Sequence, residues 1–508
     1  MISPVNPIVV GSAVIYLALV TAVGIWAAGR TNSAKDFFIA GQNIGWIVTA
    51  FATMSAAFSG FVFMGGPGLM YSVGVASLFI CIPVGFTSGL LCWVVGKRLR
   101  LLAGLKEIYT VPDIILCRYR SRRASGLAAV AVIIGTIGYL GAQLQALGIL
   151  IEMVFGTRAL LGELSLPAAM ILGSVVVVFY ATAGGMVAGV YTDVFQGLLM
   201  VVAAVLIFFY ALRSGGGLEA MSRSIISSEA FGPNHLDPFG TLPVMTAVGF
   251  FFVFAVGLLG QPHMLHKFFM LKDPRTLKWM PLVIGLTQSA CVLIWLGIGL
   301  AVPALVAQGR MAALANPDRA APQFLLEFTP GILAGLVFAG VLAAIMSTAD
   351  SFLNIGSAAI VRDLPKALGR QVRDELLWGR IAVVGLAVFS AVFAYFYKDL
   401  IALIGTFAFG TFAAALAPAV AIGLNWSRVG ATAATASIAT GMVVNLGLEF
   451  LSKQTIWEWL PSAPLKMGVL PAAVSLAASF TVLLALTWLS PASHKPDLDP
   501  DVDFVMNL

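Results

Sequence analysis

The sequence contains little charge. Only 10% of its 508 residues are Asp, Glu, Lys or Arg, whereas 60% are hydrophobic. About a quarter of the residues of a soluble protein are charged, so this composition excludes an ordinary soluble enzyme or binding domain. The net charge of +6 does not indicate nucleic-acid binding, because the basic residues lie in short segments between apolar runs. We therefore expect a membrane protein.

Cysteine is also scarce. The four cysteines form no Cys-x-x-Cys pair and show no spacing typical of a metal site, so we expect small, buried apolar side chains. Within the apolar runs there is no His-Glu-x-x-His motif, no Ser-His-Asp set and no Cys-His pairing. The sequence therefore predicts no catalytic residues and no enzyme.

Long apolar runs are the main feature of the sequence. They are continuous rather than alternating, which favours membrane-spanning helices over a barrel. Thirteen runs cover residues 8–28, 45–71, 75–96, 125–155, 165–183, 187–212, 242–266, 277–306, 328–360, 378–397, 399–425, 430–451 and 468–490.

Most of the 29 basic residues fall on one side of the membrane if the N-terminus lies outside and the C-terminus in the cytoplasm. We expect one transmembrane domain over residues 1–490 in the cell membrane, without a signal peptide, and a short cytoplasmic tail over 491–508. Two longer outer loops, near 214–241 and 307–323, are expected to contain short helices.

The ninth run contains an unusual polar stripe. Ala344, Ser347, Thr348 and Ser351 follow one another at helical spacing on one face, and Asp350 lies beside them. Ionisable and hydroxyl groups at this depth are costly and usually mark an ion or substrate path.

Two other runs are interrupted by small residues and proline, over 55–68 and over 257–263. Such breaks expose backbone carbonyls, and a pair of them points to the binding site of an inverted-repeat transporter. Carbonyls near Ser55 and Phe58, together with the hydroxyls of Ser347 and Thr348, would suit Na⁺ without a carboxylate.

Three further ionisable residues lie near these runs. Asp193 follows the pair Gly184-Gly185 and either serves an ion path at the inner mouth or caps a helix at the membrane interface. For His263 and His266 we favour structural roles over a proton relay.

At this point the sequence resembles the sodium:solute symporter family, and most of all its bacterial sodium/proline symporter branch. The matching stretches are Ser59-Gly60 with Met64-Gly-Gly-Pro67-Gly68, Val111-Pro112-Asp113, Gly184-Gly185 with Thr192-Asp193, Gly260-Gln-Pro-His263 and Met346-Ser347-Thr348. The resemblance implies an all-α polytopic membrane protein with the LeuT-like fold, built from five-plus-five inverted repeats over about 45–212 and 242–425.

The resemblance also implies a Na⁺ as coupling ion between the second and ninth spans. Its ligands would be the carbonyls of Ser55, Phe58 and Ala344 and the hydroxyls of Ser347 and Thr348. In some members a further Na⁺ is held by the residue at Asp193 and by two serines. Here those serine positions are Asp350 and Ser351, which leaves an altered second ion site, an ion path or a proton-linked group.

The predicted substrate pocket departs from that of proline carriers, which have Asp at Ala57, Trp at Phe254 and Tyr at Leu258. The candidate lining residues are Ala57, Ser59, Gly60, Tyr139, Gln143, Phe254, Leu258 and Gln261. We expect no basic residue within these spans to bind a carboxylate, and we assign Lys267 to an inner loop.

Taken together, the residues and the resemblance predict a Na⁺-coupled symporter that imports a small organic solute by alternating access, with an amino acid such as proline favoured. A monocarboxylate or another small solute, coupling to H⁺, and a transporter-like membrane sensor stay open as alternatives. The expected partners are the solute and the lipid bilayer, not nucleic acid, and the oligomeric state is not predicted.

Overall fold

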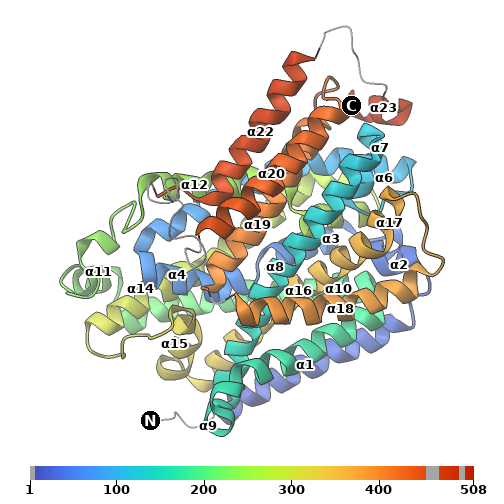
Figure 1. Ribbon diagram of the computed structural model, residues 1–508. Coiled ribbons are helices and arrows are strands. Elements are labelled where there is room, and N and C mark those ends of the chain that lie inside the picture. Colours follow the sequence, from blue (N-terminus) through green and yellow to red (C-terminus); the bar gives the residue numbers. More distant parts are fainter. Residues whose placement is uncertain (1–5, 398, 453–467, 491–497) are drawn as a thin grey trace.

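The computed structural model describes residues 6–397, 399–452, 468–490 and 498–508. Within these ranges the chain is built from helices, and its only β-type pairing is an isolated bridge between Ile44 and Leu271 (Figure 1). The predicted all-α architecture is confirmed.

The first half of the chain contains α1 (Pro7–Ala28), α2 (Ala34–Ile39), α3 (Trp46–Ala57), α4 (Gly66–Val73), α5 (Val84–Leu90), α6 (Lys97–Leu105), α7 (Val111–Tyr119), α8 (Arg122–Phe155), α9 (Arg158–Leu161), α10 (Ser165–Gly215) and α11 (Leu218–Ile226). The second half contains α12 (Val244–Val256), α13 (Pro262–Met270), α14 (Met280–Ala307), α15 (Ala320–Phe328), α16 (Gly331–Ala358), α17 (Leu364–Ala367), α18 (Glu375–Phe396), α19 (Ile401–Ala417), α20 (Ala431–Ser452), α22 (Pro471–Leu489) and α23 (Pro500–Met506).

Eleven helical segments in the described ranges are long and apolar enough to cross a membrane. Two of the predicted runs join end to end in the 51-residue helix α10, where Gly185 (φ 51°, ψ −145°) interrupts the helical backbone. Helix α3 has only 12 residues and is separated by a break from the segment Phe61–Leu105. The count of thirteen spans therefore stays a prediction.

Helices α16 and α19 lie at the centre of the molecule. In their most apolar stretches 83% and 89% of the residues are buried, compared with 28% in α1. Helix α16 packs against α1, α3, α8 and α10, and small residues permit close approach. A Cβ added at Gly340 would lie 2.8 Å from the Cβ of Ala203 on α10. Such small-residue contacts are typical of helices that associate within a bilayer.

Short helices cover the two ends of the helical bundle. The predicted loop 214–241 contains α11, as expected, whereas α15 begins in the predicted loop 307–323 and continues past it to Phe328. Figure 1 shows α11 far from α23. The tail helix α23 packs on α6. Residues 491–497 of the predicted tail lie outside the described residues.

Candidate functional site

The first predicted break is present in the structure. Helix α3 ends at Ala57, Phe58 is extended (φ −102°, ψ 109°), and the helix resumes in the segment η2 (Phe61–Gly65). Helix α8 supports this break, because the Gly60 N–H donates to Gln143 Oε1 at 2.9 Å. One turn earlier on α8, the hydroxyl of Tyr139 lies 3.3 Å from that of Ser59.

The second predicted break lies between α12 and α13. A tight turn, η7 (Gly257–Gly260), leads to Gln261, whose backbone is extended (φ −78°, ψ 104°). The Gln261 amide donates to the carbonyls of Gly257 at 3.1 Å and Phe409 at 3.0 Å. The glutamine thereby replaces backbone hydrogen bonds that the break removes.

The break in α3 meets the polar stripe of α16. Ser347 Oγ donates to the Ser55 carbonyl at 3.1 Å and lies 3.2 Å from the Ala344 carbonyl. Thr348 Oγ1 lies 3.2 Å from the Ala56 carbonyl. Both hydroxyls are buried, so five oxygen atoms from two helices converge without a carboxylate among them. We call this group the hydroxyl cradle.

Four of the five predicted Na⁺ ligands therefore lie together, those of Ser55, Ala344, Ser347 and Thr348. The Phe58 carbonyl belongs to the extended turn that follows, and its role as a ligand stays a prediction. The Ala56 carbonyl was not predicted. Its position one residue after Ser55, at the unpaired end of α3, was the signal that could have identified it.

Asp193 lies inside α10, two turns beyond Gly185, and its side chain is 1% exposed. One carboxylate oxygen lies 3.4 Å from Ser55 Oγ, and the other accepts from Lys267 Nζ at 2.9 Å. The interpretation as an interfacial helix cap is wrong, because this carboxylate is buried beside the hydroxyl cradle.

The expectation that no basic residue stands within these spans is also wrong. Helix α13 continues past the predicted boundary to Met270, so Lys267 lies inside it rather than in a loop, with a side chain that is 1% exposed. The apolar residues Phe268, Phe269 and Met270 that follow it were the signal for this continuation.

Asp350 faces α10 rather than the hydroxyl cradle. Its Oδ1 accepts from Asn354 Nδ2 at 3.1 Å, and its Oδ2 has no hydrogen-bond partner in the described part of the chain. A Cβ added at Gly189 would lie 2.0 Å from that Oδ2. The hydroxyl of Ser351 is likewise buried and unpartnered among the described residues.

The two histidines are packed among other side chains. The His263 ring lies 4.4 Å from that of Phe352 and 6.0 Å from that of Tyr139, and both His263 and His266 are buried. His263 Nδ1 and both ring nitrogens of His266 have no hydrogen-bond partner within the described residues, and the structural roles of the two histidines stay a prediction.

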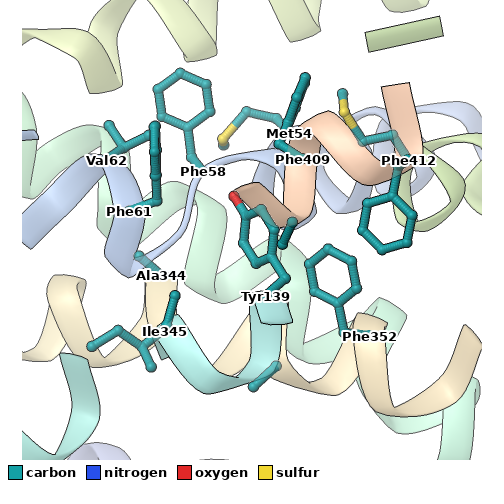
Figure 2. Close-up of a cluster of buried hydrophobic side chains, with 14 of the residues drawn as sticks. Met54, Phe58, Phe61, Val62, Tyr139, Ala344, Ile345, Phe352, Phe409 and Phe412 are labelled. Carbon is teal, nitrogen blue, oxygen red and sulfur yellow. The ribbon is translucent and has the colours of Figure 1, made fainter. Parts of the chain in front are cut away.

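A small, largely apolar cavity begins at the break in α3. Figure 2 shows Phe58, Phe61 and Val62 grouped with Phe409, and Tyr139 beside Phe352, with which it stacks at 4.5 Å. The full lining consists of Ala57, Phe58, Phe61, Val62, Ile80, Cys81, Val84, Thr87, Tyr139, Phe254, Leu258, His263, Met264, Gln288, Val292, Trp295 and Phe409.

Half of the predicted lining residues border this cavity: Ala57, Tyr139, Phe254 and Leu258. The other half does not border the cavity. These residues are buried and form the contacts described above at the two helix breaks: Ser59, Gly60, Gln143 and Gln261. The aromatic residues of η2, α14 and α19 were missed, since no local pattern relates them to the break.

Comparison with known proteins agrees with this arrangement. The model of the sodium:solute symporter family matches residues 37–441. The chain belongs to the sodium:solute symporter family.

Individual relatives match along nearly their whole length. The chain is 27% identical over 472 residues to the osmoregulated proline transporter OpuE of Bacillus subtilis, covering 89% of this chain and 92% of that one. It is 24% identical over 456 residues to the sodium/pantothenate symporter of Haemophilus influenzae, covering 87% and 89%. A solved structure of a Na⁺-coupled sialic acid symporter shares the fold, with a TM-score of 0.74, 18% identity and coverage of 95% and 98%.

The LeuT-like fold that the resemblance implied is confirmed. This member of the family is a Na⁺-coupled solute symporter in the cell membrane and not an enzyme, and Na⁺ is its coupling ion.

Proposed function

We propose that this symporter imports a small amino acid such as proline and that its Na⁺ binds at the hydroxyl cradle. The proposal rests mainly on one observation: the hydroxyl cradle and the apolar cavity are formed by consecutive residues of the chain. Ser55 and Ala56 contribute carbonyls to the hydroxyl cradle, and the next two residues, Ala57 and Phe58, line the apolar cavity. An ion that orders this break therefore also shapes one wall of the cavity.

The proposed ligands are the carbonyls of Ser55 and Ala344 and the hydroxyls of Ser347 and Thr348 in the hydroxyl cradle, together with the carbonyl of Phe58 from the extended turn that follows it. The hydroxyls now interact with carbonyls of α3, so the same atoms can turn towards an ion between the helices. A set of neutral oxygens binds Na⁺ weakly enough for release, which a transport cycle requires.

The proposed mechanism is alternating access. The regions 45–212 and 242–425 would act as two inverted repeats, with the N-terminus outside and the C-terminus in the cytoplasm. Movement of α16 away from α3 would separate the two hydroxyls from the carbonyls of α3 and release the ion inward. Each charge that enters supplies about 2.3 kcal/mol per 100 mV of membrane potential.

Uptake into proteoliposomes tests the hydroxyl cradle. The double variant Ser347→Ala/Thr348→Ala should lose Na⁺-stimulated uptake, because both hydroxyls that bridge to α3 are removed. Ser357→Ala is the matched control, since Ser357 is a buried serine of the same helix whose hydroxyl bonds to the Asn354 carbonyl. Unchanged Na⁺ dependence in the double variant would contradict the assignment.

The solute is proposed from the relatives and from the residues that line the cavity. Several relatives are named as proline carriers, whereas the cavity has Ala57, Phe254 and Leu258 at the positions where proline carriers differ. A monocarboxylate or another small organic solute is the second candidate. Competition for Na⁺-driven uptake by proline, pyruvate and pantothenate would separate the classes, and inhibition by pyruvate but not proline would overturn the amino-acid assignment.

A further inference from the structure

An apolar groove lies between the first half of α10 and α18, and it shares no lining residue with the cavity at the break in α3. Helices α1, α10 and α18 run side by side along one edge of the molecule (Figure 1). Every residue that lines the groove is apolar except Ser174, Thr182 and Arg380. The two hydroxyls already donate to the carbonyls of Ile171 and Val178. The guanidinium of Arg380 is therefore the polar group of the groove that needs a partner.

The groove has the length of a lipid chain in one leaflet. Its lining on α10 extends from Ile171 to Ala183, which is about 18 Å of helix at 1.5 Å per residue. The hydrocarbon layer of one leaflet is about 15 Å thick, half of that of the bilayer. Several lining side chains are exposed on the described structure, among them Val175, Phe179 and Val388. In a bilayer these side chains face lipid.

Arg380 lies at the end of the groove that is formed by Ala183. Phe37 packs against both Gly185 of α10 and Gly379 of α18, since a Cβ added at either glycine would lie within 3.2 Å of its side chain. The start of α18 is therefore beside the end of the α10 lining. With the N-terminus outside, as proposed above, this is the cytoplasmic end of the groove.

Two exposed tryptophans mark the same end as the membrane interface. Trp378 precedes Arg380 by two residues, and Trp26 precedes Ala28, the groove residue of α1, by two residues. Tryptophan is enriched at the level of the lipid headgroups, so Arg380 lies close to that level. A basic side chain at this depth is within reach of lipid phosphates.

Arg380 also lacks an acceptor in the described part of the chain. Its Nε is buried without a hydrogen-bond partner, and Glu375, the nearest acidic residue along α18, pairs with Arg362 at 3.2 Å. Arginine binds phosphate through two parallel N–H bonds. Basic pockets between membrane helices on the cytoplasmic side bind anionic lipid headgroups.

We propose that this groove binds an anionic phospholipid of the cytoplasmic leaflet. The phosphate accepts from the guanidinium of Arg380, and one acyl chain lies between α10 and α18. A headgroup with a net negative charge binds better than phosphatidylcholine, because the choline ammonium already neutralises the phosphate of the latter. The proposal depends neither on the transported solute nor on the hydroxyl cradle.

Native mass spectrometry of the purified protein tests the headgroup, with equal amounts of phosphatidylglycerol and phosphatidylcholine that carry the same acyl chains. We expect the wild type to retain phosphatidylglycerol about fivefold better, which is the contribution of one basic residue near anionic lipid, and Arg380→Gln to lose this preference. Arg373→Gln is the matched control, since it removes an exposed arginine from the segment before α18. Equal retention of both lipids by the wild type, or an unchanged preference in Arg380→Gln, would overturn the proposal.

A second variant tests the acyl chain and also serves if Arg380→Gln fails to fold. Val388→Trp fills the groove and should reduce the retention of both lipids, whereas Val443→Trp, which enlarges an exposed valine of α20, should not. Equal retention in these two variants would overturn the proposal.

Two further results would assign the groove to another occupant. Inorganic phosphate should not displace the lipid, because it has no chain to fill an apolar groove. Displacement would assign Arg380 to a soluble anion and overturn the proposal. A lipid-free dimer that Val388→Trp dissociates would overturn it as well, because a second copy of the chain would then fill the groove.

Discussion

At the scale of single residues, hydrogen bonding separates the two parts of the polar stripe. Ser347 and Thr348 interact with carbonyls across the interface with α3, whereas Asp350 and Ser351 each bury an oxygen that lacks a partner among the described residues. Helical spacing placed these groups on one helix correctly. It could not show that Asp350 faces Gly189 of α10, because that contact depends on how the two helices pack.

The substitution Asp350→Ser should stabilise the protein and leave Na⁺ stimulation intact. The change removes a buried, unpartnered carboxylate oxygen, a kind of group that typically costs about 1–3 kcal/mol or more. Thermal unfolding of the purified protein measures the stability, and uptake measures the coupling. Ser357→Ala is again the control, and a folded Asp350→Ser variant without Na⁺ stimulation would assign Asp350 a direct role in coupling.

At the scale of elements, the helix breaks were predictable and their partners were not. Glycine and proline together in one apolar segment predict an interrupted helix, and both breaks occur within the segments predicted from the sequence. The ion pair between Lys267 and Asp193 joins residues 74 positions apart, and no periodicity within one helix relates them. The same holds for the aromatic wall of the cavity, which several helices build together.

The segment that leads into α15 carries a pH-sensitive contact. Asp318, in the turn η9 (Pro317–Arg319), accepts from the Ile401 N–H at the start of α19 at 3.0 Å, and it lies against Gly68 of α4. The pKa of Asp318 is raised from 3.8 to about 7, chiefly by burial and to a smaller extent by the charge of Asp399, against the opposing effect of the hydrogen bond from the Ile401 N–H. The packed segment therefore binds a proton more tightly than an exposed one.

We expect a rise in pH on the side of the membrane that this segment faces to loosen it. Below about pH 4, the proton on Asp318 makes its full contribution to the stability of the packed arrangement. As the pH rises towards 7 this contribution is lost, and the free energy of the packed arrangement changes by up to about 1.4 kcal/mol per pH unit. Cys81, which lines the cavity, can report opening through its labelling by an impermeant maleimide in a variant without the other three cysteines.

The matched control for this experiment is Asp318→Asn, which cannot titrate. The labelling rate of the aspartate form divided by that of Asp318→Asn cancels the pH dependence of the reagent itself. This ratio should rise between pH 5 and pH 7. A ratio that stays constant would show that Asp318 does not govern access to the cavity.

At the scale of the whole molecule, the tail helix is connected to the buried ion pair through α6. Asp499 forms ion pairs with Lys106 at 2.7 Å and Arg120 at 3.7 Å, and Val502 and Val505 of α23 are buried. Hydrogen bonding to Lys106 lowers the pKa of Asp499, so this contact is present at neutral pH. On α6, Arg100 donates to the carbonyls of Leu271 and Lys272, which directly follow α13.

Release of α23 should therefore increase hydrogen exchange in α6 and at the end of α13. Asp499→Asn/Asp501→Asn removes the carboxylates that pair with Lys106, and high salt should reproduce the effect in the wild type, since exposed ion pairs are screened. Asp503→Asn, on the exposed side of the same helix, is the control. Because each exposed pair contributes only about 0.2–1 kcal/mol, the global unfolding temperature should change little while local exchange rises. Equal exchange in both variants would mean that Val502 and Val505 hold the helix in place without its charges.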